Sequence, residues 1–300
     1  MIPARFVAGA TLTLAAGSVT AGSLPPQGCD RRHDLSATEQ DRLLRFAAVI
    51  RQTLTESGAQ VALIARSGTD LSRFGLRYSH AAIALASGLD SPWAVRQLYY
   101  ACNEGAPRLF DQGLAGFVAG SDDAALGYVS LLLLPADAAP ALAEAALNKP
   151  TALSLVAPRY SANAWPFSTR YQNCNQWVAE LIAAAHSPAA PSGAVREDAQ
   201  AWLKREGYAP VPVRASPLMM LAGRFVPWLH FDDQPDELLA QNQVQTSLPE
   251  SLETLAQQRW PGSRHVELCH GPQGVVKRAG GSALAAGCVP QAGDQVTALD

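Results

Sequence analysis

Residues 78–85 of the chain read YSHAAIAL, and residues 171–181 read YQNCNQWVAEL. The first stretch predicts a buried strand with His80 at its start, because apolar residues follow the histidine without a break. The second predicts an amphipathic helix that begins at Cys174 and carries Trp177 on its inner face. The free N–H groups of a helix start favour a thiolate, and a neighbouring imidazole can serve as its base. Cys174 and His80 are therefore the parts of a thiol nucleophile.

Plainer interpretations of these two residues stay open at this point. A cysteine on an apolar helix is often a buried and unreactive residue, and a histidine at a strand end is often structural. The chain has an odd number of cysteines, so one of them is left without a disulfide partner, and this favours the interpretation of Cys174 as a reactive thiol.

The start of the chain predicts export. Arg5 supplies a positive charge, residues 6–16 are uncharged and apolar, and residues 19–21 form a small-residue cleavage site. We therefore expect residues 1–21 to be a signal peptide and the mature protein to be periplasmic or secreted, without a stable membrane span.

An exported chain reaches an oxidising compartment, where cysteines tend to pair. The chain has five cysteines, so one of them is left over. Cys269 and Cys288 lie in one short segment and are natural partners, and Cys29 with Cys102 then forms a second disulfide. This is one of the three pairings that four cysteines allow, and it leaves Cys174 free.

The pattern of apolar residues predicts an α+β fold. The expected strands form an antiparallel sheet with packed helices, and residues 78–86 and 93–102 form a hairpin across the turn at Gly88. The other expected strands are residues 60–66, 128–134 and 153–157. The first expected helix lies within residues 30–57, with a capping box at Ser36 and Glu39. The other expected helices are residues 138–148, 174–185, 195–205 and a last helix that ends near residue 259.

The composition excludes two classes of protein. The chain has 23 lysines and arginines against 26 acidic residues, so it lacks the positive field that a general nucleic-acid binder needs. Its apolar content of 48% excludes a disordered chain.

The runs SHAAIAL and NCNQWVAEL together resemble the permuted branch of the NlpC/P60 superfamily of papain-like cysteine hydrolases, in which the histidine strand precedes the cysteine helix. That resemblance covers roughly residues 60–185. The stretches ARSGTDLSRFGLRYSHAAIA, RLFDQGLAGF and LHFDDQP resemble DUF2145, a family of exported bacterial proteins, over most of the mature chain.

The NlpC/P60 resemblance implies that Cys174 is the nucleophile and His80 the general base. It also implies a third polar residue on the strand that follows the histidine strand, where it orients the imidazole. Gln97 is the suitable side chain if residues 93–102 pair with the histidine strand. Asn103 and Glu104 are the alternatives if the register differs.

The sequence also suggests residues that contact the substrate. Tyr171 and Tyr78 lie beside the two motifs and are expected to line the site, and the backbone N–H of Cys174 is expected to be an oxyanion donor. No metal-binding or cofactor motif is found, so we expect neither group.

We expect residues 22–190 to form a permuted NlpC/P60-like domain. Residues 191–300 are expected to be a C-terminal helical extension with a small hairpin, His265–Cys269 with Gly274–Lys277, held by the Cys269–Cys288 disulfide. The sequence leaves open whether this extension is a domain of its own or wraps the first one.

The expected function is that of an exported thiol hydrolase, which cleaves an amide or ester bond of a peptide or cell-wall-type substrate through an acyl-enzyme. The alternatives are a thiol acyltransferase, which uses the same chemistry with another acceptor, and a non-catalytic periplasmic binding or assembly protein that keeps the fold and has a protein partner.

Overall fold

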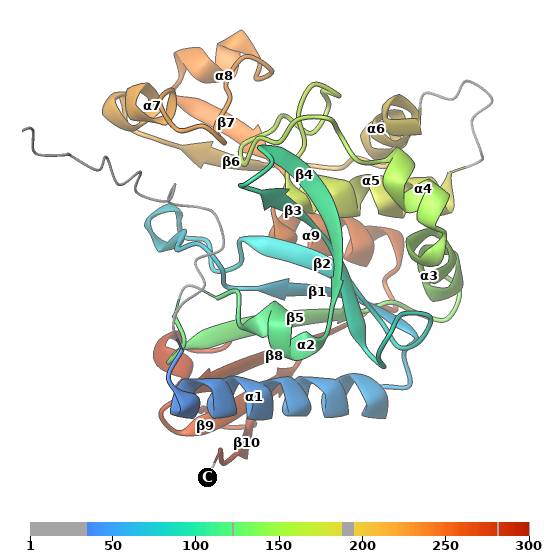
Figure 1. Ribbon diagram of the computed structural model, residues 1–300, viewed down its shortest axis with the longest axis vertical. Helices are drawn as coiled ribbons and strands as arrows, with labels where there is room; N and C mark the ends of the chain where they lie inside the picture. Colours follow the sequence, from blue (N-terminus) through green and yellow to red (C-terminus); the bar gives the residue numbers. More distant parts are fainter. Residues whose placement is uncertain (1–34, 122, 188–194, 281, 300) are drawn as a thin grey trace, which may run out of the picture.

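The computed structural model describes residues 35–121, 123–187, 195–280 and 282–299. The predicted signal peptide, residues 1–21, and Cys29 lie outside the described residues. The fold is mixed α+β and is built on an eight-stranded antiparallel sheet with the strand order β10-β9-β8-β5-β1-β2-β3-β4 (Figure 1). Its strands are β1 (Val61–Arg66), β2 (His80–Leu85), β3 (Ala94–Ala101), β4 (Ala106–Gln112), β5 (Gly127–Leu133), β8 (Arg264–Gly271), β9 (Gly274–Ala279) and β10 (Gln295–Thr297).

Helices cover both faces of this sheet. One face packs against α1 (Ala37–Glu56) and α2 (Leu114–Val118), and the other packs against α3 (Ala139–Leu147), α5 (Cys174–His186) and α9 (Pro249–Arg259). A second sheet of two strands lies at one end of the molecule with α7 and α8 (Figure 1). The remaining elements are α4 (Lys149–Ser154), α6 (Val195–Arg205), β6 (Val211–Arg214), α7 (Pro217–Gly223), α8 (Asp236–Ala240), β7 (Gln243–Thr246) and the short 3₁₀ helices η1 (Ser72–Phe74) and η2 (Ala286–Cys288).

The central strands read as continuous apolar runs because both of their faces are covered. On β1, Leu63 and Ala65 join the core under α3 and α5, whereas Ala62 and Ile64 join the core under α1. The same alternation holds along β2 and β3. It decides on which face each polar side chain of these strands lies.

The helix that precedes the sheet begins where the sequence predicts. The Ser36 hydroxyl accepts the N–H of Glu39 at 3.3 Å, and the Glu39 carboxylate accepts the N–H of Ser36 at 2.8 Å. This reciprocal capping satisfies two N–H groups that a helix start leaves free. It fixes the start of α1, whose apolar stripe packs on the sheet.

One expected strand is absent from the structure, and one observed strand was not expected. Residues 153–157 do not form a strand, because Asn148 accepts the N–H of Thr151 at 3.0 Å and caps α4, which begins at Lys149. Strand β4 was not predicted, since it lies at the edge of the sheet and its residues are mostly partly or fully exposed. Edge strands carry polar residues and lack the apolar run of a central strand.

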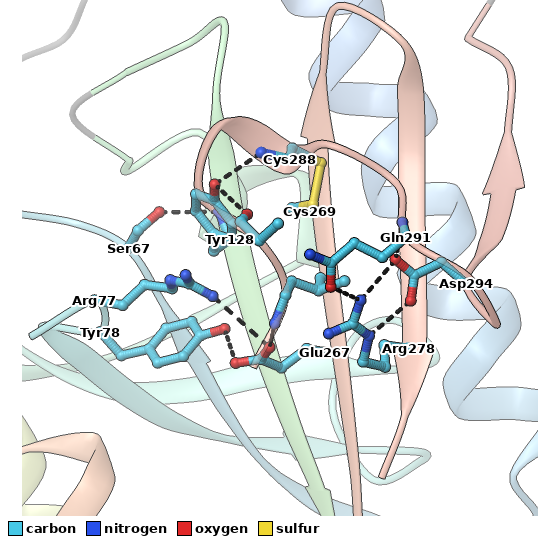
Figure 2. Close-up of a disulfide and its surroundings, with 12 residues drawn as sticks. Ser67, Arg77, Tyr78, Tyr128, Glu267, Cys269, Arg278, Cys288, Gln291 and Asp294 are labelled. Atoms are coloured by element: carbon cyan, nitrogen blue, oxygen red, sulfur yellow. Dashed lines mark hydrogen bonds and ion pairs between the residues drawn. A yellow bond between two sulfur atoms is a disulfide. The ribbon is translucent and has the colours of Figure 1, made fainter. Parts of the chain in front are cut away.

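The C-terminal hairpin is part of the main sheet. Strand β8 pairs with β5 from Leu133 opposite Arg264 to Gly127 opposite His270, and β9 then pairs with β8. The predicted disulfide between Cys269 and Cys288 is present, with 5.7 Å between its Cα atoms (Figure 2). The end of the chain is thus fastened to the sheet that carries His80.

The loop around Cys288 is held by side chains from the sheet as well. The Tyr128 hydroxyl accepts the N–H of Cys288 at 2.9 Å and donates to the carbonyl of Ala285 at 3.2 Å (Figure 2). Glu267 accepts the N–H of Leu284 at 2.6 Å. The disulfide and these contacts together hold residues 284–288 on β5 and β8.

Loss of the Cys269–Cys288 disulfide is expected to destabilise the fold. The bridge joins residues 19 positions apart, and closing a loop of that length restricts the unfolded chain by about 3 kcal/mol. The variant with both cysteines changed to alanine should lose that much free energy of unfolding, measured by urea denaturation. Cys174→Ala is the matched control for the removal of a buried sulfur, and equal midpoints for the double variant and the wild type would contradict the prediction.

In the described ranges, no helix is both long enough and apolar enough to cross a bilayer.

Candidate functional site

The start of α5 is tied to the start of β2. Asn175, the residue after Cys174, accepts the N–H of Ala81 at 2.8 Å and donates to the carbonyl of Ser79 at 3.1 Å. Its amide also donates to the carbonyl of Ser247 at 3.0 Å. One side chain therefore binds the backbone on both sides of His80, so that the first turn of the cysteine helix is fixed against the histidine strand.

Cys174 is the first residue of α5. Asn173 caps the helix by accepting the N–H of Gln176 at 2.7 Å, and Trp177 lies fully buried one turn further on. The thiol is free, and only 8% of the residue is exposed. Cys102 is disulfide-bonded, whereas Cys29, its predicted partner, lies outside the described residues.

His80 is held by Gln97, the residue that the sequence favours as the third member. The imidazole Nε2 and the Gln97 Oε1 are 2.6 Å apart, and both residues are buried. Since the amide oxygen only accepts, Nε2 carries the proton in this pair. The other ring nitrogen, Nδ1, is then the one that can accept a proton.

The alternatives to Gln97 lie elsewhere. Asn103 and Glu104 belong to the turn between β3 and β4, and Glu104 pairs with Arg108 at 2.5 Å. Strand β3 pairs with β2 through Ile83 opposite Arg96. That register places the middle of β3, and not its end, beside the histidine.

Cys174 and His80 approach the end of β2 from different faces of the sheet. The imidazole lies toward α2, with its ring 5.9 Å from that of Phe117 and 5.1 Å from that of Tyr99. Cys174, the first residue of α5, lies next to the N–H of Ala81, whose side chain joins the core under α3 and α5. Within the described part of the chain, no hydrogen bond joins the thiol to the imidazole.

Burial dominates the protonation of both groups. It raises the pKa of Cys174 to about 11, although the N–H groups of Asn175, Cys174 and Ala81 and the charge of Arg66 pull the pKa down. Burial together with the charge of Arg66 lowers the pKa of His80 to about 3, against the hydrogen bond of Gln97. The N–H groups of the helix start thus favour the thiolate in the predicted direction, but the burial of the thiol outweighs them.

Cys174 should accordingly react slowly with small alkylating reagents. With a pKa near 11, its thiolate fraction at pH 7 is about a hundredfold below that of an ordinary thiol, and the rate should rise about tenfold per pH unit up to pH 11. Iodoacetamide labelling followed by mass spectrometry measures the rate, and the urea-unfolded protein is the control. Labelling at pH 7 as fast as that of a free cysteine would contradict this prediction.

Two residues that the sequence did not single out belong to this site. Burial raises the pKa of Tyr160 well above its usual range, and the charge of Cys174 and the hydrogen bond between the Tyr160 hydroxyl and Cys174 raise it further. The Tyr160 ring stacks on Tyr100, with 5.0 Å between the ring centres. Arg66, at the end of β1, is paired in register with His80 and is 2% exposed. A charged residue that closes the apolar run VALIAR is the signal that would have pointed to Arg66.

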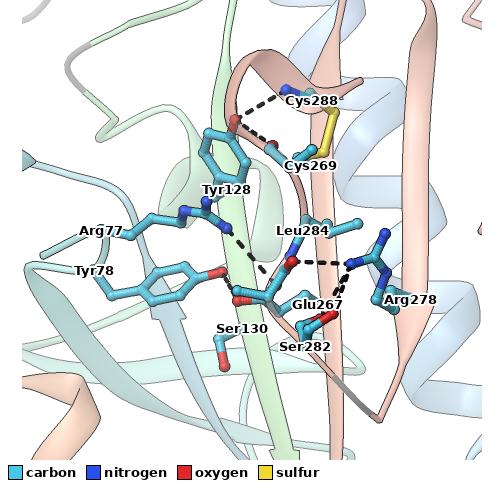
Figure 3. A network of polar contacts seen from close by, with 12 residues as sticks. Arg77, Tyr78, Tyr128, Ser130, Glu267, Cys269, Arg278, Ser282, Leu284 and Cys288 are labelled. Carbon is cyan, nitrogen blue, oxygen red and sulfur yellow. Dashed lines mark hydrogen bonds and ion pairs between the residues drawn. A yellow bond between two sulfur atoms is a disulfide. The ribbon is translucent and has the colours of Figure 1, made fainter. Parts of the chain in front are cut away.

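The tyrosines expected to contact substrate have internal partners. Tyr78 is buried and donates to Glu267 at 2.8 Å (Figure 3). Tyr171 donates to Asp232 at 3.3 Å, and its ring stacks on His230 at 4.4 Å. Their hydroxyls are used to connect parts of the fold, so the structure does not bring them into the cluster around Cys174 and His80.

The fold and this cluster define a mixed α+β protein with a free thiol at the start of a helix. That helix start is hydrogen-bonded to the buried strand that carries the histidine. Residues 53–255 match the family described as "uncharacterized protein conserved in bacteria (DUF2145)", and the chain belongs to this family. No curated protein and no solved structure matches the chain.

Proposed function

We propose that the protein is a thiol hydrolase that cleaves an amide or ester bond through an acyl-enzyme on Cys174. The observation that carries the proposal is the clamp of Asn175 on the backbone at Ser79 and Ala81, because it places the thiol next to the strand of the histidine. The order of His80 before Cys174 and the antiparallel sheet support a permuted NlpC/P60-like arrangement.

The first half of the reaction forms a thioester. The Nδ1 of His80 takes the thiol proton as the sulfur attacks the carbonyl carbon of the substrate, and the S–C bond forms. The imidazolium then gives this proton to the leaving amine or alcohol as the scissile bond breaks. The backbone N–H of Cys174 donates to the oxyanion.

The second half restores the enzyme. His80 takes a proton from a water molecule, which attacks the thioester carbonyl, and the proton returns to sulfur as the acid leaves. Transfer to an amine or alcohol in place of water gives an acyltransferase by the same steps.

Proton transfer requires the Nδ1 of His80 and the thiol to come within hydrogen-bond reach when the substrate is bound. Gln97 serves as a positioning residue, because its bond to Nε2 fixes the tautomer that leaves Nδ1 as the acceptor. The substrate class that the NlpC/P60 resemblance implies is peptides or cell-wall peptide amides. An exported protein, stabilised by its disulfide, would meet such substrates in the periplasm or outside the cell.

Trapping of the acyl-enzyme tests the proposal. The protein is mixed with the 4-nitrophenyl ester of N-acetylalanine, and separately with cell-wall peptides, and is quenched in acid at short times. Intact-protein and peptide mass spectrometry should find the acyl mass on Cys174. The Cys174→Ala variant is the control, and the absence of an adduct and of product with every substrate would refute the hydrolase.

Burial of the thiol favours a second candidate, a periplasmic binding or assembly protein without turnover. Cys174 is 8% exposed and its pKa is raised to about 11, as for a structural thiol. This candidate predicts that Cys174→Ala leaves the cellular role of the protein intact. The hydrolase predicts that the same variant loses it, so complementation of a deletion strain separates the two.

A further inference from the structure

Among the residues that the structure describes, Arg66 is a buried cation without a carboxylate partner. The residue is 2% exposed, and its Nε and Nη1 have no hydrogen-bond acceptor. Its Nη2 donates to the Tyr99 hydroxyl, and its guanidinium lies 5.4 Å from the centre of the Phe117 ring. Among the described residues, no acidic side chain forms an ion pair with Arg66.

Burying a charge without a partner is costly. A second buried arginine, Arg196, shows the usual solution, because its guanidinium binds Glu180 at 2.8 Å. The described residues around Arg66 offer no carboxylate of this kind. Strand β2 contributes His80, β3 contributes Tyr99, α2 contributes Phe117 and α5 contributes Cys174, and none of these is an acid.

The loops beside the guanidinium carry glycines. A methyl group at Gly120 would lie 2.5 Å from Nη2 and 2.8 Å from Nη1, and one at Gly68 would lie 3.3 Å from Nη1. Any side chain at Gly120 would therefore displace the guanidinium. Gly68 and Gly120 themselves approach Arg66 with backbone only, and no described residue satisfies Nη1.

We propose that Arg66 is an anion-binding residue of the Cys174 site and receives a carboxylate of the substrate. Guanidinium and carboxylate match in charge and planar geometry, and such charge-assisted bonds are strong where water is excluded. The inference rests on the proposed function for the statement that this anion belongs to a substrate. The substrate class is then an amide or ester that carries a free carboxylate near the scissile bond.

Ligand-dependent thermal unfolding tests the inference on the full-length protein. The probes are acetate and N-acetylglycine, and their neutral counterparts are acetamide and N-acetylglycinamide, all at a constant ionic strength set with sodium chloride. The two anions should raise the Tm of the wild type in a concentration-dependent manner, as expected for a ligand that binds the folded state. The neutral amides should leave the Tm unchanged.

Arg66→Gln and Arg66→Leu should bind the two anions at least about tenfold more weakly, and two variants guard against one of them failing to fold. Arg96→Gln is the matched control, because Arg96 lies on the same sheet but is paired with Asp111 at 2.6 Å. It should keep the response of the wild type. Equal Tm shifts in wild type and Arg66→Gln, or equal shifts from acetate and acetamide, would overturn the inference.

The outcome is independent of the trapping experiment. An anion response that depends on Arg66, in a protein that forms no acyl-enzyme, would support the anion site and refute the hydrolase. An acyl-enzyme on Cys174 without any anion response would support the hydrolase and refute the anion site.

Discussion

Cys174→Ala should lower the rate of ester or peptide hydrolysis by at least about 10⁴-fold, because the nucleophile of an acyl-enzyme reaction has no substitute. His80→Ala should lower kcat by about 10²- to 10⁴-fold, the usual contribution of a general base. The rate of 4-nitrophenol release from the N-acetylalanine ester measures both effects. Circular dichroism of each variant shows whether the fold is retained.

Gln97→Leu should have a smaller effect than His80→Ala and one of a different kind. The hydrogen bond from Gln97 raises the pKa of His80 against burial and the charge of Arg66, so its loss should move the acid limb of the pH–rate profile to lower pH. A merely structural role of Gln97 would lower the rate without moving this limb. His186→Ala is the control, since His186 lies at the far end of α5 and should leave the rate unchanged.

Two outcomes would contradict these roles. Hydrolysis that survives Cys174→Ala would show that the activity arises elsewhere on the protein. Equal rates for His80→Ala and the wild type would show that His80 is not the base. The approach of the two side chains from different faces of the sheet would then keep them apart during the reaction.

The sequence predicted which residues meet at the candidate site better than it predicted their protonation. The register of β3 beside β2 could be predicted from the sequence, because a hairpin across Gly88 places the middle of the next strand near His80. Gln97 is the suitable polar residue at that position. The pKa of Cys174 could not be predicted from the sequence. A helix start lowers this pKa and burial raises it, and only the packing of α5 decides which effect is larger. The face on which His80 lies depends in the same way on the exact alternation along β2.

Contacts between residues far apart in the sequence could not be predicted either. The sequence placed Cys269 near Cys288 because they are close along the chain, but nothing local showed that β8 would pair with β5. Tyr78 was expected at the substrate because it adjoins His80, and it binds Glu267, which lies 189 positions further on. Contacts of this kind depend on the order of strands in the sheet, which periodicity does not encode.

The largest effect on stability is expected at Glu180. This carboxylate is fully buried on α5 and binds Arg196 through both of its oxygens, at 2.8 and 2.9 Å. Glu180→Ala should cost about 3–5 kcal/mol of unfolding free energy, because it leaves the Arg196 charge buried without its partner. Urea denaturation followed by tryptophan fluorescence measures this loss.

The surroundings of the pair explain why the cost should be high and why it should reach the candidate site. Glu180 also accepts hydrogen bonds from three glutamine side chains, those of Gln172, Gln176 and Gln200. Arg196 in turn donates to the carbonyls of Thr169 and Tyr171, in the segment that leads into Cys174. Loss of the pair should therefore loosen the start of α5 as well as lower the stability.

A double-mutant cycle separates the pair from its desolvation. Glu180→Leu alone and Arg196→Met alone should each destabilise, whereas the double variant Glu180→Leu with Arg196→Met should recover part of the loss, because no buried charge then remains. The exposed pair of Arg45 and Asp41 is the control, with side chains 49% and 58% exposed, and Asp41→Ala should cost less than about 1 kcal/mol. Strictly additive effects of the Glu180 and Arg196 substitutions would mean that the two charges do not stabilise one another in the folded protein.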